Sequence, residues 1–356
     1  MLERSRLEAG RRARFSVSAP TLADVAELAG VSRQTVSNAV NNPDLLRADT
    51  LARVQQAIDE LGYKPNRAAR NLRTRSSHLV GLRISPVQEG TASAVMDRFV
   101  HSLVEKSGQA GYHVMLFTSD HDDPLTGYDE LLRSTAVDAF IVTDTYLGDP
   151  QAQWLRERRA PFVAFGRPWD DAKARHPWVD IDGAAGVELA TRHLIEKGHT
   201  RIAWIGWRKD SVLGEERRSG WLRAMHHAGL PTTGLASRVE DAVASGRSAA
   251  GVLLDEAAPT AFVCASDTLA IGVMHTLAER RLQAGDDVAV VGFDDSQVAQ
   301  TIWPGLTSVR QPLENAAFEV VKALEGLLAT PSQVGPGVML TPALEVRGTS
   351  GPDRLR

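Results

Sequence analysis

A short segment of the chain carries polar side chains at the spacing of one helical face. Within residues 33–41 (RQTVSNAVN), Val36 and Val40 are four residues apart and would face inward on a helix. The outer face then carries Arg33, Gln34, Ser37, Asn38 and Asn41. Arg, Gln and Asn supply the donors and acceptors that read base edges in a DNA major groove, whereas an ordinary solvated helix more often carries Glu and Lys. The segment favours a base-reading helix, with an ordinary polar face as the alternative.

Pairs of carboxylates in the rest of the chain could do a different kind of chemistry. Asp294-Asp295 follows an apolar run and could suggest acid/base catalysis, and Asp180 with Asp182 could suggest metal ligands. Neither pair has an identifiable nucleophile or His partner, and the common phosphate-loop, dinucleotide, zinc-protease and nucleophile-elbow motifs are absent. The single cysteine, Cys264, excludes a disulfide framework. We therefore expect binding roles, with no catalytic residue, metal or cofactor.

The elements that must position the polar face form a small helical unit. Thr21 can cap a first helix, with Asp24 at the capping-box offset. Gly30 permits the left-handed turn that ends this helix, and Ser32 can cap the next. We expect helices over residues 22–29, 33–41 and about 48–61. Two short helices joined by a glycine turn and covered by a third predict a helix-turn-helix unit.

Charge is distributed unevenly along the 356 residues. The chain has a net charge of −4, but residues 1–77 hold 13 Lys and Arg against 8 Asp and Glu. A basic front on an acidic remainder suggests contact with a polyanion, although residues 1–19 alone would fit a disordered basic tail. No apolar run approaches the roughly 18 residues of a membrane span, and the N-terminus lacks the apolar core of a signal peptide. We expect a cytoplasmic protein without a membrane partner.

The front of the chain resembles a known DNA-binding module. TLADVAELAGVSRQTVSNAVN, followed by LGYKPNRAARNL, closely resembles the head of the LacI family of transcriptional regulators over residues 20–77. The resemblance implies that Ser32, Thr35 and Tyr63 contact phosphates, while Arg33 and Gln34 reach bases. Phosphate contacts position such a module and base contacts specify the sequence. The DNA-binding residues expected on this basis are Thr21, Ser32, Arg33, Gln34, Thr35, Ser37, Asn38, Asn41, Tyr63, Asn66, Ala69, Arg70 and Leu72.

Two positions depart from the family pattern. Asn38 stands where the family usually has an Arg that reads guanine, and the shorter Asn prefers an adenine edge. We therefore predict a shifted operator preference at that base. Leu51 replaces a common Arg, so one phosphate contact would be missing.

Residues 65–77 form the expected hinge and linker after the helix-turn-helix domain of residues 20–64. The segment from Pro65 is too short to be a stable helix alone in water. By the resemblance, it becomes helical when two copies meet on DNA. Leu72 would then wedge into the minor groove, with Ala69 at the paired-helix contact and Asn66 as the backbone anchor; such wedges kink the duplex. The alternative makes Leu72 a core residue of the head.

From Leu79 onward, apolar runs alternate with helical periods, which predicts parallel sheets covered on both faces. Strands are expected at 79–84, 114–117, 139–142, 162–165, 202–205, 261–264 and 288–293, and helices near 93–109, 183–196, 217–228, 246–255 and 268–281. Residues 79–348 resemble the LacI family again, with the fold of periplasmic sugar-binding proteins.

The resemblance implies an effector-binding and dimerisation domain of two lobes at 78–348, followed by a tail at 349–356. Lobe one would comprise about 78–179 and 311–338, and lobe two about 180–310 and 339–348. The chain would cross between them near 179–182, 310 and 338. The expected fold class is thus an all-α head plus an α/β two-lobed body.

An effector is expected between the lobes, because ligands of open α/β sheets bind at the carboxyl ends of strands. The resemblance points to Arg217 in an R-x-x-G pattern, Asp294 after a strand, and Trp178 as a stacking ring. Gly166 replaces an acidic residue of some relatives, so Arg167 or Trp169 would compensate. The full set is Ser85, Arg167, Trp178, Arg217, Ser266, Asp294 and Gln311.

Each of these assignments has a plainer alternative. Arg217 could simply pair with Glu215 or Glu216, and Asp294 could cap a turn. Trp178 could belong to the core. Asp267 is expected to cap the helix that starts at Thr268.

The sequence therefore predicts a regulator that binds near-palindromic DNA as a homodimer. We expect it to repress carbohydrate-use genes and to leave its operator when a sugar binds. The tail after Val346 has no heptad, so a tetramer is not expected. The alternatives are a nucleobase-corepressed regulator of the same family, a sugar-binding module without DNA function, and an α/β enzyme.

Overall fold

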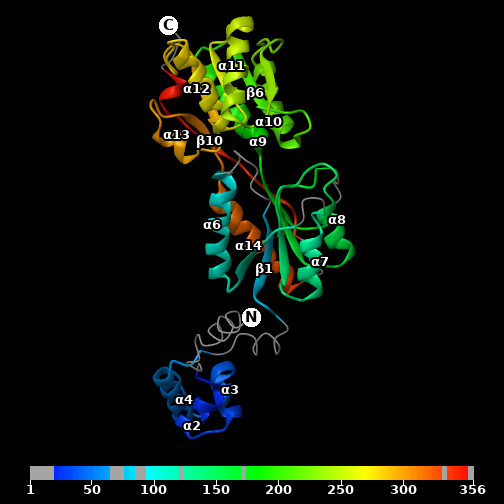
Figure 1. Ribbon diagram of the computed structural model, residues 1–356, viewed down its shortest axis with the longest axis vertical. Coiled ribbons are helices and arrows are strands. Elements are labelled where there is room, and N and C mark those ends of the chain that lie inside the picture. The colour runs from blue at the N-terminus through cyan, green and yellow to red at the C-terminus, as the bar shows by residue number, and fades with distance from the viewer. Residues whose placement is uncertain are drawn as a thin grey trace, which may run out of the picture. The chain divides into compact units, whose positions relative to one another are not determined.

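The computed structural model describes residues 20–64, 76–84, 94–119, 123–169, 174–330 and 335–351. It divides into two compact units, Met1–Ser76 and Ser77–Arg356, which are called the head and the body below (Figure 1). The expectations for the tail at 1–19, for Asn66, Ala69, Arg70 and Leu72 in the hinge, and for Ser85 fall outside the described residues. Within the described residues, no helix combines the length and apolar character that a bilayer span requires.

Over residues 20–64, the head contains the three predicted helices, α2 (Leu22–Ala29), α3 (Arg33–Asn41) and α4 (Ala48–Leu61), with a short 3-10 turn, η1 (Pro43–Leu45). The predicted caps are confirmed. Thr21 and Asp24 form a capping box, and the Ser32 side chain accepts from the Thr35 backbone N–H. Gly30 ends α2 with φ 64°, a left-handed conformation that glycine adopts without a steric penalty. A small core holds the helices together: Val25, Ala26, Ala29, Val36, Val54, Ala57 and Tyr63.

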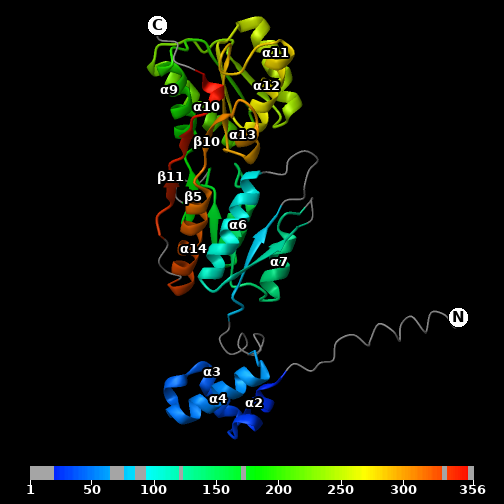
Figure 2. The same ribbon diagram turned by 90° about the vertical axis from the view of Figure 1, so that its left-hand side faces the viewer.

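The first sheet of the body has six parallel strands in the order β11-β5-β4-β3-β1-β2. The strands are β1 (Leu79–Arg83), β2 (His113–Phe117), β3 (Ala139–Val142), β4 (Phe162–Phe165), β5 (Trp178–Ile181) and β11 (Val338–Leu340). Helices α6 (Ala94–Gln109) and α14 (Leu313–Ala329) pack together on one face, and α7 (Thr126–Arg133) and α8 (Pro150–Glu157) lie on the other (Figures 1 and 2). These elements form lobe one.

The second sheet has the order β12-β10-β9-β8-β6-β7, and only the β10–β12 pair is antiparallel. Its strands are β6 (Ile202–Trp207), β7 (Ala236–Val239), β8 (Ala261–Cys264), β9 (Ala289–Phe293), β10 (Thr307–Arg310) and β12 (Ala343–Glu345). Its helices are α9 (Gly183–Glu196), α10 (Val212–His227), α11 (Val243–Ala257), α12 (Asp267–Glu279), α13 (Gln297–Thr301) and η2 (Gly348–Ser350). Together they form lobe two.

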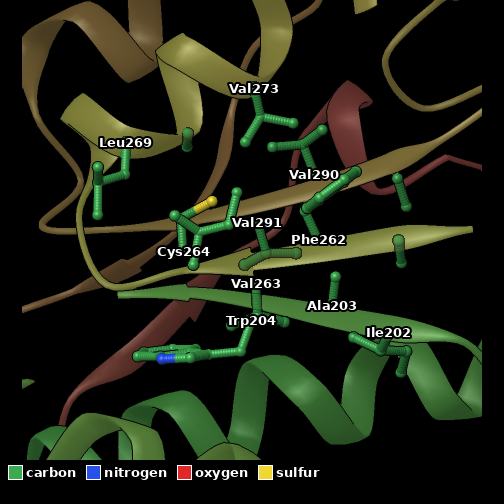
Figure 3. Packing of buried hydrophobic residues seen from close by; sticks show 14 of the residues in the cluster. Ile202, Ala203, Trp204, Phe262, Val263, Cys264, Leu269, Val273, Val290 and Val291 are labelled. Atoms are coloured by element: carbon green, nitrogen blue, oxygen red, sulfur yellow. The ribbon is translucent and has the colours of Figure 1, made fainter. Parts of the chain in front are cut away.

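The core of lobe two lies on both faces of its sheet. Figure 3 shows Leu269 and Val273 of α12 on one side of the strands and the indole of Trp204 on the other. All three side chains are buried. Helices on both faces explain why the strands read as continuous apolar runs rather than as alternating ones.

The chain passes between the two sheets three times. It leaves lobe one after β5, returns from β10 to α14, and leaves again from β11 to β12. The third passage was expected near residue 338, but Val338–Leu340 pair with β5 and extend the first sheet, so the passage follows Leu340. Asp180 and Ile181 likewise belong to β5 and lobe one, although lobe two was expected to begin at about 180.

Candidate functional site

The outer face of α3 carries the polar side chains that the helical spacing predicted. Arg33 and Gln34 are exposed, and Asn38 is half-buried beside them. Gln34 Nε2 donates to Asn38 Oδ1 at 3.1 Å, so the two amides form one joined surface. Asn41 Nδ2 instead donates to the Ser37 backbone carbonyl at 2.7 Å. An arginine and paired amides on one helical face can hydrogen-bond to base edges in a major groove.

The other described residues expected to bind DNA, including the phosphate contacts Ser32, Thr35 and Tyr63, lie at or near the ends of the head's helices. Thr21 is the exposed cap of α2. Ser32 caps α3, and its hydroxyl also lies 2.9 Å from the Thr35 hydroxyl. Helix N-termini attract anions because their backbone N–H groups lack partners within the helix. Tyr63 differs, because its ring is 8% exposed and packs in the head's core.

A cavity of about 270 Å³ lies between the two lobes of the body. Lobe one supplies residues that end or follow its strands, and lobe two does the same, as expected for a site at the carboxyl edges of parallel sheets. The lining consists of Val95, Met96, Asp144, Thr145, Phe165, Gly166, Trp169, Asp180, Ile181, Gly183, Trp207, Leu213, Arg217, Asp241, Phe293, Asp294 and Gln311.

Arg217 of α10 is a buried side chain in the cavity wall that contacts two aromatic rings. Its guanidinium carbon lies 3.7 Å from the ring centroid of Phe293 and 4.7 Å from that of Trp207. Its Nη1 donates to the backbone carbonyl of Ala265 at 2.5 Å. Burial lowers the pKa of Arg217, while the aromatic faces and nearby carboxylates favour the charged form.

The position of Arg217 depends on how closely α10 approaches α9. A side chain at Gly220 of α10 would collide with the backbone carbonyl of Ala184 in α9. The glycine of the R-x-x-G pattern therefore lets α10 approach α9 closely, and α10 in turn carries Arg217 to the end of the second sheet.

Asp294 follows β9 and lies beside Arg217 in the lobe-two wall of the cavity. Its Oδ1 accepts from Gln311 Nε2 at 2.7 Å and lies 3.8 Å from Arg217 Nη1. Burial raises the pKa of Asp294 to about 7, against the opposing effect of the Arg217 charge. Its φ of 114° is unusual for a residue other than glycine and aims the chain directly out of the strand.

Lobe one meets lobe two through Arg167. Its Nε donates to Asp180 Oδ2 at 2.5 Å within lobe one, and its Nη2 donates to Glu216 Oε1 at 2.7 Å across to α10. Trp169 lies in the cavity wall, with Nε1 donating to Thr145 Oγ1 at 3.2 Å. The Arg167 guanidinium lies 4.6 Å from the Trp169 ring centroid.

Two family models match the chain. Residues 21–66 match the model described as bacterial regulatory proteins of the lacI family, and residues 191–350 match a periplasmic binding protein-like domain. The transcriptional regulator CelR of Thermobifida fusca is 38% identical over 86% of this chain and 91% of its own length. The chain belongs to the LacI family.

Solved LacI-family structures share its fold over nearly the whole chain. A CelR–cellobiose complex is 33% identical, with a TM-score of 0.71, covering 93% of this chain and 99% of that one. A lac repressor dimer bound to operator and the anti-inducer ONPF is 28% identical, with a TM-score of 0.79, covering 94% and 99%.

Three of the expected effector residues, Arg217, Asp294 and Gln311, come together in this LacI-family cavity. Arg167 lies behind its wall, where it contacts the lining residue Asp180. The plainer alternative for Arg217, a pairing with Glu215 or Glu216, does not describe its contacts, because Glu215 pairs with Arg238 and Glu216 with Arg167.

Two other residues expected to bind the effector lie outside the cavity lining. Trp178 is the first residue of β5, at the end of the strand opposite the cavity, and its ring packs against the lobe-one core. Ser266 is buried, caps α12 and donates to Asp241, so it lies behind the lining rather than in it. Asp267 is consequently not the cap. Its carboxylate accepts from Ser308 and from the Ser296 backbone.

The sequence reasoning missed Trp207 and Asp241 as lining residues and considered Asp180 only as a metal ligand. Trp207 ends β6, so its place at a carboxyl strand end was a usable signal. Asp241 follows β7, a short strand that the sequence analysis did not predict. Among the described residues, no group of three or more His, Cys, Asp or Glu side chains could hold a metal ion.

Proposed function

We propose that this LacI-family chain is a cytoplasmic repressor of carbohydrate-use genes, which a sugar bound between the lobes releases from its operator. The observation that carries the proposal is the composition of the cavity. Carboxylates and Arg217 stand beside four aromatic rings, those of Phe165, Trp169, Trp207 and Phe293. A sugar offers hydroxyl edges to the polar groups and an apolar C–H face to the rings.

One solved relative supports a sugar as the ligand. A transcriptional regulator CelR that is 33% identical to this chain has been solved as a complex with cellobiose. Two indoles in the wall, Trp169 and Trp207, suit a glucoside or a short oligosaccharide. We propose that the cavity binds this ligand without converting it, so the sugar should be recovered unchanged after incubation with the protein.

The head needs a second copy to read two half-sites, so the repressor would act as a homodimer on a near-palindrome. The lac repressor relative was solved as a dimer on its operator. Sugar binding would couple to DNA binding through a difference in affinity between two states of the body.

The test is fluorescence anisotropy on DNA from upstream of the protein's own gene, with and without a pool of mono- and oligosaccharides. We expect tight binding that weakens with salt and is lost when the pool is added. Arg33→Ala should abolish DNA binding while leaving sugar binding intact. Tight binding that is indifferent to sugars but strengthened by purines would replace the proposal with the nucleobase-corepressed alternative.

A further inference from the structure

The cavity has an unequal balance of charge. Four carboxylates line it: Asp144, Asp180, Asp241 and Asp294. Arg217 is the one cationic side chain among the described lining residues. The carboxylates come from both lobes, so a ligand would meet acceptor oxygens on both sides.

The arginines of the site are already engaged. Arg217 lies over the rings of Phe293 and Trp207, and its Nη1 donates to the Ala265 carbonyl, while its Nε has no hydrogen-bond partner in the described structure. Asp294 Oδ1 lies 3.8 Å from Nη1. Arg167, the nearest arginine behind the wall, binds Asp180 and Glu216. Arg98 of α6 donates to the backbone carbonyls of Asp294 and Asp295. Each guanidinium therefore has at least one acceptor that the protein itself supplies, and the Nε of Arg217 is open to a ligand oxygen.

A phosphate or carboxylate on the ligand would have to compete for these arginines. It would also lie close to the carboxylates of the wall, and like charges brought together in a partly desolvated site are strongly disfavoured. Hydroxyl groups face no such penalty, because they donate to carboxylates. Trp207 Nε1 adds a buried donor that has no hydrogen-bond partner in the described structure, and it suits a ligand oxygen.

We infer that the cavity selects sugars that carry neither phosphate nor carboxylate. The inference rests on the proposed function and narrows it, because a sugar-responsive regulator could equally recognise a phosphorylated sugar. Exclusion arises from the negative charge of the wall rather than from the size of the cavity. Asp144 and Asp241 supply most of that charge, because Asp180 pairs with Arg167 and burial raises the pKa of Asp294 to about 7.

Calorimetric titration of the full chain with matched sugars tests this. The first set is glucose, glucose 6-phosphate and glucuronate. The second set is cellobiose, cellobiose 6-phosphate and the uronic acid of cellobiose. In every set that binds, we expect the uncharged sugar to bind at least tenfold more tightly. A charged member that binds equally or better overturns the inference and leaves the sugar proposal standing. If no sugar of either kind binds, both fall.

Variants of the wall test the cause. Asp144→Asn and Asp241→Asn each remove one negative charge with little change in shape. Each should reduce the ratio of the affinity for the uncharged sugar to the affinity for the charged sugar at least threefold. Glu256→Gln removes an equal charge from the exposed face of α11 and should leave the ratio unchanged. Two wall variants are used because Asp241 also accepts from Ser266. If both wall variants gave the same affinity ratio as the Glu256→Gln control, the inference would be contradicted.

Discussion

Arg217 keeps a positive charge in a place that water scarcely reaches. Its residue is 6% exposed, and the loss of hydration is offset by two ring faces, the Ala265 carbonyl and Asp294. These partners fix the plane of the guanidinium before any ligand arrives. Such preorganisation lowers the entropic cost of binding.

Replacing Arg217 by lysine should therefore be far from conservative. An ammonium group cannot stack flat between Phe293 and Trp207 while donating sideways to a carbonyl. We expect Arg217→Lys to lower the affinity for the effector at least about tenfold, or about 1.4 kcal/mol, as measured by calorimetric titration. Arg218→Lys, at the neighbouring position outside the cavity lining, is the matched control and should stay close to wild type.

Asp294 predicts a particular dependence of stability on pH. Its pKa is raised from 3.8 to about 7, so the folded state holds a proton that the unfolded state releases near pH 4. The stabilisation from this proton is complete below pH 4 and is lost as the pH rises to 7. Relative to Asp294→Asn, the wild-type protein should lose on the order of 2 kcal/mol of unfolding free energy between pH 5 and 7. Denaturant unfolding of the body at both pH values measures this, and a difference that does not change with pH would refute it.

Asn38 predicts a change in base preference. Its amide is joined to that of Gln34, and an amide pair suits adenine better than guanine. We expect Asn38→Arg to move the preferred base at one operator position to guanine, with a discrimination of about 1–3 kcal/mol. Selection from randomised DNA with both proteins tests it. Recovery of guanine there by the wild-type chain would refute the prediction.

Strand ends explain which site residues the sequence could identify. Asp294 and Trp207 each stand at or just after the last residue of a strand, where the sheet edge forms the cavity. Trp178 was misplaced because the sequence analysis predicted no strand over residues 178–181. Its position at the amino end of β5, away from the carboxyl edge that borders the cavity, was therefore not recognised. Ser266 was misplaced because a side chain just after a strand can cap the next helix instead.

At the scale of elements, long apolar runs were predictable and short polar ones were not. The long runs that became β1, β6 and β9 were predicted. Strand β7 (ASRV) and strand β10 (TSVR) each have four residues with polar side chains among them, and their pairing is set by neighbours distant in sequence. Helix α14 was also missed, although its apolar residues recur at helical spacing.

The contact between α9 and α10 gives a prediction at this scale. Gly220→Ala would place a methyl group against the Ala184 carbonyl and push α10 outward, carrying Arg217 with it. We expect a loss of about 1–3 kcal/mol in the free energy of unfolding and a lower affinity for the effector. Gly326→Ala in α14 is the control, because its added methyl meets open space and should stabilise by about 0.5–1 kcal/mol. Thermal unfolding with and without sugar distinguishes the two.

At the scale of the molecule, two arginines of lobe one reach across to lobe two. Arg167 pairs with Glu216, and Arg98 donates to the carbonyls that follow β9. Burial raises the pKa of Glu216, while Arg167 opposes that rise by favouring its charged form. These contacts join the two lobes.

Breaking the charged contact should therefore let the lobes separate. Glu216→Gln keeps the shape but removes the charge that Arg167 meets. We expect a larger radius of gyration by small-angle X-ray scattering in the absence of sugar, and a return toward the wild-type value when sugar is added. Glu215→Gln removes a charge that pairs with Arg238 within lobe two and should change neither value.

The three passages of the chain between the lobes also set the order in which a newly made protein can be completed. All the residues that build the head's core have been synthesised once Tyr63 is made. Lobe one must wait for α14 and β11, which come from residues 313–340, because Leu313, Val320 and Leu324 fill its core. During synthesis its sheet consequently stands with apolar side chains uncovered while lobe two is being made. A message cut short before α14 would yield the part that meets DNA without an intact sensor.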